Sequence, residues 1–148
     1  MEGFEQFSQA VGCLYRDMQK LQRAEMAKYG LKGIHAECLL AMLRYPEGMT
    51  CARLGRLCDK DKAAISRTVS ELERQGLISR QENNGVRYRA VLHLTEQGTA
   101  AAGAVRAASM GRVKQAGEAM SAESRRSFCE NADLLARNLH TLCTREMR

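Results

Sequence analysis

One stretch of the chain, residues 61–76 (DKAAISRTVSELERQG), constrains the fold more than any other. It predicts a short helix with both ends marked, because Asp61 suits the N-cap position and Gly76 the left-handed position that closes a helix. Between these ends, Ile65, Val69 and Leu72 recur at spacings of four and three and form one apolar stripe. The helix therefore buries one face and exposes the other.

The opposite face of this helix is small, hydroxylated and basic. Small residues let a helix approach a partner closely, and hydroxyls and arginines supply hydrogen-bond donors, so the face suits a DNA groove. Many solvated helix faces have the same composition, and the stretch alone favours a solvated face, so the surrounding sequence has to decide. The residues of this face are Ala63, Ser66, Arg67, Ser70 and Arg74.

Positive charge is concentrated around this helix. The 148 residues carry a net charge of +6, which favours an anionic partner. Residues 51–90 hold nine Lys and Arg against five Asp and Glu, so about a quarter of the chain carries +4 of the +6. The charge pattern thus points to the same region as the helix.

The segment before residue 61 predicts a second short helix. Thr50 suits the N-cap position of a two-turn helix over residues 51–58, and residues 59–60 form the turn that leads to Asp61. Two short helices joined this tightly make a helix-turn-helix, in which the second helix is placed to read a DNA groove.

The segment after Gly76 predicts a β-hairpin. Leu77 begins a strand, residues 82–85 (ENNG) carry the Asn-Gly signal of a tight turn, and residues 86–94 return as a second strand. Helix, turn, helix and two-stranded ribbon make a winged helix-turn-helix. The ribbon carries Arg80, Arg87 and Arg89.

Both ends of the chain predict helices with a narrow apolar seam, which suits a partner helix. We therefore expect a mainly α fold with a small two-stranded β-wing, flanked by N- and C-terminal dimerisation helices. The chain is read as one domain over residues 1–148, with the winged helix-turn-helix at 34–95 and dimerisation helices at 1–30 and 96–148. The seams consist of Phe4, Phe7, Val11, Leu14, Met18 and Leu21, and of Phe128, Ala132, Leu135, Leu139 and Leu142.

The chain resembles the MarR family of bacterial transcription regulators along nearly its whole length. Three motifs, in the order expected for that family, carry the resemblance. They are residues 61–67 (DKAAISR), 72–78 (LERQGLI) and 94–98 (LTEQG). The resemblance implies a homodimer built from the terminal helices and a recognition helix in the major groove. It also implies a wing arginine in the minor groove and, often, a small-molecule pocket between the dimer and DNA-binding regions.

The wing departs from the pattern of that family. An Asp-x-Arg pair usually precedes the second strand, but Val86 and Tyr88 occupy those positions here, and Arg87 and Arg89 flank the second of them. Either arginine can enter a narrow A·T-rich minor groove, and Asn84 or its neighbour Asn83 can replace the missing acceptor.

Side-chain type assigns roles within the expected interface. Arg67 is the candidate for bidentate contact with a guanine edge. The other basic and hydroxyl side chains hold the phosphate backbone. The backbone N–H groups after Thr50 hold a phosphate at a helix N-terminus. The candidate DNA-binding residues are Thr50, Lys62, Ala63, Ser66, Arg67, Ser70, Arg74, Asn84, Arg87 and Arg89.

The remaining reactive residues suggest neither catalysis nor a cofactor. His35 and Cys38 are spaced to share a metal ion, but no further cluster surrounds them, and a core cysteine beside a polar residue explains them as well. Among six cysteines, Cys51 is the thiol best placed for reactivity, although small apolar packing accounts for all six. No CxxC pair, leader sequence or apolar run of about 18 residues occurs, so we expect reduced thiols, a cytoplasmic protein and no membrane partner.

These features predict a sequence-specific double-stranded DNA-binding transcription regulator and no enzyme. We expect a repressor that acts as a homodimer on an inverted-repeat operator and is released by a small-molecule effector. Two alternatives stay open, namely a thiol- or metal-responsive sensor on the same fold and a winged-helix module that binds another protein.

Overall fold

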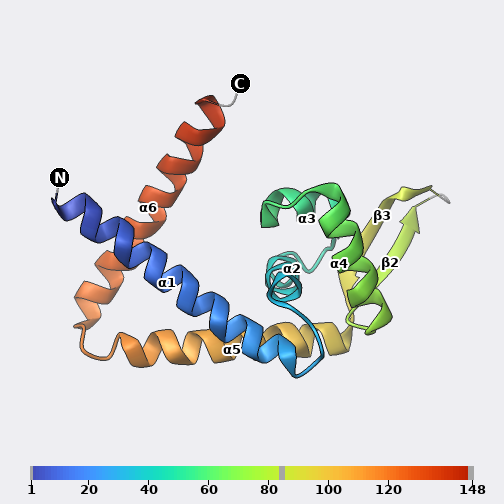
Figure 1. Cartoon of the computed structure of the whole chain (residues 1–148). Helices are drawn as coiled ribbons and strands as arrows, with labels where there is room; N and C mark the ends of the chain where they lie inside the picture. The colour runs from blue at the N-terminus through green and yellow to red at the C-terminus, as the bar shows by residue number, and fades with distance from the viewer. Residues whose placement is uncertain (1, 84–85, 147–148) are drawn as a thin grey trace. The chain divides into compact units, whose positions relative to one another are not determined.

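The chain divides into two compact units, residues 1–110 and residues 111–148. The structure, a computed structural model, describes residues 2–83 and 86–146, and the side chains of residues 2, 82–89 and 146 lie outside that description. The elements are α1 (Glu2–Ala27), α2 (Gly33–Leu43), β1 (Met49–Thr50), α3 (Cys51–Cys58), α4 (Lys62–Arg74), β2 (Ile78–Asn83), β3 (Val86–Leu94), α5 (Glu96–Ala116) and α6 (Ala122–Glu146) (Figure 1). The expected class, mainly α with a winged helix-turn-helix, is confirmed. Within the described residues, no helix combines the length and hydropathy that crossing a bilayer would require.

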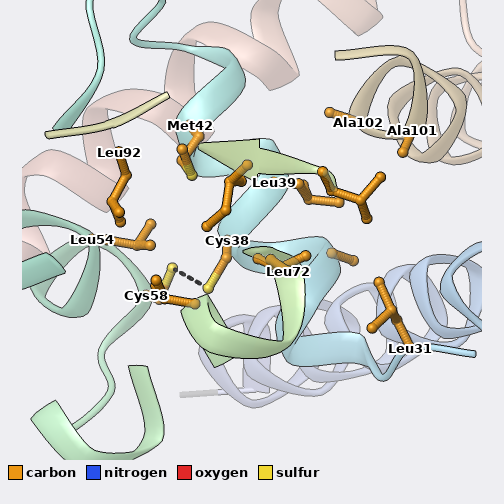
Figure 2. Packing of buried hydrophobic residues seen from close by; sticks show 14 of the residues in the cluster. Leu31, Cys38, Leu39, Met42, Leu54, Cys58, Leu72, Leu92, Ala101 and Ala102 are labelled. Atoms are coloured by element: carbon orange, nitrogen blue, oxygen red, sulfur yellow. Dashed lines mark hydrogen bonds between the residues drawn. The ribbon is translucent and has the colours of Figure 1, made fainter. Parts of the chain in front are cut away.

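The core of the first unit surrounds α2, whose sequence is apolar on most sides. Leu39 and Cys38 are fully buried on α2, and side chains from α3, α4, the sheet and the first half of α5 close around them (Figure 2). Burial of large apolar side chains is the main force that holds these short helices together, because two-turn helices are marginal in isolation. The surrounding side chains include Leu54, Ile65, Val69, Leu72, Leu92, Ala101 and Val105.

Helix α4 begins and ends where its sequence predicts. The Asp61 carboxylate accepts a hydrogen bond from the Ala64 N–H at 2.8 Å. At the other end Gly76 has φ +69°, the left-handed conformation that glycine adopts without a steric cost. The N–H groups of Gly76 and Leu77 donate to the carbonyls of Glu73 and Leu72, which is the Schellman pattern of helix closure.

The hairpin is confirmed, and a third strand adds to it. The antiparallel sheet has the order β1-β3-β2, with Met49 opposite Leu92 and Thr50 opposite Val91. Strand β1 is only two residues long, so it carries no alternation that a sequence pattern could reveal. Thr50 therefore serves both as the end of this strand and as the expected N-cap of α3.

Two of the sequence motifs meet in space where the wing ends and α5 begins. The Thr95 hydroxyl donates to the Gly76 carbonyl at 2.6 Å and accepts from the Gly98 N–H at 3.0 Å. A Cβ on Gly98 would lie only 1.7 Å from the Leu77 carbonyl oxygen. Glycine at position 98 is therefore required for the start of α5 to pack against the end of α4.

The second unit contains the end of α5, a turn and α6. Ser121 caps α6, because its hydroxyl accepts a hydrogen bond from the Ser124 N–H at 3.1 Å. The Arg125 guanidinium donates to the carbonyls of Gly117 and Met120, at 2.9 and 2.6 Å, and so fixes the turn.

The apolar seams of both terminal helices are exposed to solvent. On α1, Phe4 is 75% exposed, and on α6 Leu139 is 57% exposed. Exposed apolar stripes of this length mark interaction surfaces in soluble proteins. The other exposed large members are Phe7, Val11, Leu14, Met18, Phe128, Leu135 and Leu142.

Candidate nucleic-acid interface

Helix α4 presents one buried face and one exposed face. Ile65, Thr68, Val69 and Leu72 are buried, and the Thr68 hydroxyl donates to the Ala64 carbonyl at 2.9 Å. Because the buried positions follow the helical period, the polar positions between them share the outer surface. This surface brings together six of the residues predicted from the sequence, all of them exposed: Lys62, Ala63, Ser66, Arg67, Ser70 and Arg74.

One hydroxyl group on this surface already forms a hydrogen bond within the helix. The Ser70 hydroxyl donates to the Ser66 carbonyl at 2.9 Å, within the helix. Its oxygen keeps acceptor capacity, but its single proton is already committed to the helix backbone. Ser70 can therefore pack against a phosphate or accept a hydrogen bond more readily than it can donate one.

The turn between α3 and α4 is short and conformationally special. Asp59 adopts a left-handed conformation with φ 50° and ψ 51°, and the Lys60 N–H donates to the Gly55 carbonyl at 3.0 Å. Short polar side chains such as Asp adopt this conformation at low cost. Thr50 lies at the other end of α3, where its hydroxyl accepts from the Arg53 N–H at 3.3 Å.

The N-terminus of α4 carries a fixed negative charge beside the basic surface. The hydrogen bond from the Ala64 N–H lowers the pKa of the Asp61 carboxyl below its ordinary value. The backbone N–H of Ala63 and the positive charge of Arg67 act in the same direction. The carboxylate is thus ionised throughout the physiological pH range. It holds the first turn of α4 rigid and faces the helix N–H groups instead of an incoming phosphate.

The wing is joined to α4 by an ion pair that the sequence pattern did not reveal. Arg80 of β2 donates from Nε and Nη2 to the two carboxylate oxygens of Glu73, each at 3.0 Å. The two side chains are 19% and 29% exposed, and the Glu73 carboxylate raises the pKa of Arg80 above its ordinary value. Arg80 therefore acts within the protein by positioning the wing.

A second polar contact joins α2 to α4. The Lys32 N–H donates to His35 Nδ1 at 3.0 Å, so we assign the ring proton to Nε2, which lies 2.6 Å from Glu71 Oε2. His35 is buried, and Glu71 is partly exposed. This contact supports the polar-residue interpretation of His35, because its ring faces Glu71. Within the part of the chain that the structure describes, no three His, Cys, Asp or Glu side chains gather as a metal site would require.

Two hollows flank α4. The larger, of about 720 Å³, lies between α3, α4 and β2 and is lined by Lys62, Ser66 and Arg80 among others. The smaller, of about 350 Å³, is lined by Arg67, His35 and Glu71 among others. Residues of the candidate interface therefore line both hollows.

Three predicted wing residues, Asn84, Arg87 and Arg89, lie outside the described part of the chain or have side chains outside it. Their roles stay predictions. The positioning residues Arg80 and Glu73 were missed because they lie seven positions apart on different elements, and only the charges of the two side chains gave a signal.

Comparison with known proteins shows which fold the chain shares and which family model its central region matches. Residues 29–87 match the model of the MarR family. This match and the structural likenesses that follow confirm the resemblance expected from the sequence. No curated protein sequence matches the chain.

Three solved structures show the likeness of the fold. A MarR family transcription regulator is 24% identical, with a TM-score of 0.78, over 97% of this chain and 94% of the other. A MarR transcriptional regulator from Methanosarcina mazei Go1 is 20% identical, with a TM-score of 0.81, over 93% and 99%. MepR, a transcription regulator of the Staphylococcus aureus multidrug efflux pump MepA, is 16% identical, with a TM-score of 0.69, over 90% and 98%.

Proposed function

Since the chain carries a MarR-family region within a MarR fold, we propose that it is a transcription regulator that binds double-stranded DNA in a sequence-specific manner. The observation that carries this proposal is the outer face of α4, where six basic, hydroxyl or small side chains are exposed together. The opposite face is anchored in the core by Ile65, Val69 and Leu72. A helix held in this way can enter a major groove without losing its packing.

The roles of the exposed side chains follow from their chemistry. Arg67 has the bidentate donors that match the O6 and N7 acceptors of guanine. Lys62 and Arg74 contact phosphates, which supply affinity and register but no sequence information. Ala63 and Ser66 allow close approach of the helix to the bases, and Ser70 contacts the DNA backbone.

Contacts outside α4 complete the proposed interface. The N–H groups that follow Thr50 face a phosphate at the N-terminus of α3. Arg87 or Arg89 enters the adjacent minor groove, with Asn84 as the acceptor that orients the arginine. The Arg80–Glu73 ion pair supports this arrangement because it fixes the base of the wing against α4.

The protein acts as a homodimer on an inverted-repeat operator. The exposed seams of α1 and α6 support a dimer, since a second copy would cover apolar surface that is otherwise in water. In this division of the chain, residues 34–95 bind DNA and residues 1–30 and 96–148 form the dimer. Two recognition helices in a dimer reach half-sites about one DNA turn, roughly 34 Å, apart.

The regulator represses transcription and is released by a small-molecule effector. Support for an effector comes from the hollow of about 720 Å³, a volume typical of sites for small ligands. A ligand in this hollow would touch Lys62 and Ser66 and would therefore compete directly with DNA.

Protection mapping on the DNA next to the protein's own gene tests the proposal. A protected inverted repeat, with an affinity that falls steeply as salt rises, is the expected result, because phosphate contacts release counterions. Binding to a protein partner with no protected DNA would instead favour the winged-helix interaction module.

A further inference from the structure

Two cysteine thiols face each other in the core beneath the helix-turn-helix. Cys38 of α2 and Cys58 of α3 lie twenty positions apart in the chain, and their Sγ atoms are 4.0 Å apart. Figure 2 shows the two sulfurs pointing toward each other among Leu39, Leu54 and Leu72. Cys38 is fully buried, whereas Cys58, the last residue of α3, is 9% exposed. An oxidant can therefore reach Cys58 first.

The surroundings of the pair make its two thiols chemically different. The contact with the Cys38 thiol lowers the pKa of Cys58, and the charge of Lys60 acts in the same direction, against the opposing effects of burial and of the Glu37 carboxylate. The same contact, together with burial, raises the pKa of Cys38. The thiolate is the reactive form of cysteine, so Cys58 suits the attacking role and Cys38 the resolving role.

We propose that Cys38 and Cys58 form a redox-sensing dithiol that closes to an intramolecular disulfide when the protein meets a two-electron oxidant such as hydrogen peroxide. The Cys58 thiolate attacks one peroxide oxygen, the O–O bond breaks, and hydroxide leaves and takes up a proton. The Cys38 sulfur then attacks the resulting sulfenic acid and loses its proton as water leaves. One peroxide is reduced to two waters, and two thiols are oxidised to one disulfide.

Closure of the bond must move α3 relative to α2. The sulfur atoms have to approach from 4.0 Å to about 2.05 Å. Cys58 is followed directly by the left-handed Asp59, and the N-cap Asp61 of α4 lies two residues further on, so the movement acts at the turn that positions α4. Close-packed cores transmit such shifts instead of absorbing them. The disulfide is thus a switch that lowers the affinity for DNA, an inference that rests on the proposed function.

The test uses the full chain and separates the chemistry from its effect on DNA. One variant, Cys13→Ser/Cys51→Ser/Cys129→Ser/Cys143→Ser, keeps only the proposed pair, and a second, Cys38→Ala, removes the resolving thiol. Each protein is reduced, treated with hydrogen peroxide and alkylated. Peptide mass mapping without reductant then detects a peptide linked through Cys38 and Cys58. Binding to the DNA next to the protein's own gene is measured before and after oxidation and again after dithiothreitol.

The wild type and the pair-only variant should form the linked peptide and bind DNA roughly tenfold more weakly, in the range typical of coupled sites, with recovery in dithiothreitol. Cys38→Ala should lose this reversible response. Free thiols or sulfinic acid at Cys58 without the linked peptide would overturn the proposal. A linked peptide with unchanged DNA affinity would overturn the switch.

Two further results keep the interpretation distinct. A reduced protein that binds no DNA would contradict the proposed function, while the linked peptide would still decide the chemistry of the pair. If circular dichroism shows that Cys38→Ala is unfolded, the pair-only variant decides instead, because its four substitutions lie at exposed or half-buried positions.

Discussion

Arg80 of β2 and Glu73 of α4 form two parallel hydrogen bonds of 3.0 Å each, so the strand that leads into the wing is tied to α4. Planar, bidentate pairs of this kind fix orientation as well as distance. The base of the wing is therefore fixed against α4. In the proposed complex with DNA, this pre-organisation would reduce the conformational entropy lost on binding.

The first prediction tests this ion pair. Arg80→Ala should lower the free energy of unfolding by about 1–2 kcal/mol, between the values for exposed and for buried charged hydrogen bonds. A double-mutant cycle with Glu73→Ala, measured by urea denaturation, isolates the coupling. Lys20→Ala is the matched control, since Lys20 pairs with Asp17 where both side chains are more than two-thirds exposed. If Arg80→Ala and Lys20→Ala lower the free energy of unfolding by the same amount, the account of the ion pair is wrong.

The second prediction concerns two glycines of α5. Gly98→Ala should destabilise the protein by about 3 kcal/mol, because the new Cβ would collide with the Leu77 carbonyl oxygen. Gly103→Ala should instead stabilise it by about 0.5–1 kcal/mol, since nothing lies within 4 Å of its Cβ position. Urea denaturation at one protein concentration compares the two. If both substitutions change the free energy of unfolding by a similar amount, Gly98 does not pack closely against the Leu77 carbonyl.

The ends of α4 and the wing hairpin could be predicted because their signals are local. Asp61 and Gly76 lie within one turn of the bonds that they make, and the stripe from Ile65 to Leu72 follows the helical period. Strand β1 was missed because Met49 and Thr50 form a strand only by pairing with β3, some forty positions later. Pairing of this kind depends on tertiary packing and leaves no periodic trace in two residues.

The cysteines show the same limit of sequence-based prediction, because their partners lie on different helices. The position of Cys51 near a helix start made it the thiol best placed for reactivity, although the sequence favoured a packing role for all six cysteines. The pair that the fold brings together is Cys38 and Cys58, on different helices. Spacing within one helix suggested His35 and Cys38 as partners, but His35 bonds to Glu71 instead. Side-chain partners across elements require the packed structure.

The third prediction follows from the lowered pKa of Asp61. Its folded pKa lies below its unfolded pKa of about 3.9, so the stabilisation is complete above that pH and is lost as the pH falls through the folded value. Asp61→Ala should therefore be less stable than the wild type at pH 7, and this difference should shrink below about pH 4. Asp61→Asn should retain much of the cap. A difference that stays constant from pH 7 to pH 3 would exclude a role for the charge.

The fourth prediction concerns the homodimer. Leu135→Glu places a charge in the exposed seam of α6 and should shift the protein toward monomer in sedimentation velocity at micromolar concentration. Thr144→Glu adds the same charge nine positions later, on the opposite side of the helix, and should leave the dimer intact. A wild-type protein that sediments as a folded monomer would contradict the dimer directly.

The division of roles between helix and wing predicts how arginine substitutions change DNA recognition. Arg67→Ala should cost about 1–3 kcal/mol of binding free energy and relax the preference at one position in each half-site. Arg87→Ala or Arg89→Ala should weaken binding more evenly across sequences, except where an A·T tract narrows the minor groove. Arg56→Ala, on α3 outside the proposed contacts, is a control for the loss of one positive charge.

Competition binding against a complete set of single-base operator variants, with the wild type and Arg67→Ala side by side, tests most directly that α4 reads the DNA sequence. The account predicts that the wild type discriminates at an inverted pair of positions and that Arg67→Ala loses discrimination there while keeping it elsewhere. If Arg67→Ala weakens binding to every variant by the same factor, Arg67 holds only the phosphate backbone and the assignment of sequence reading to this residue is wrong.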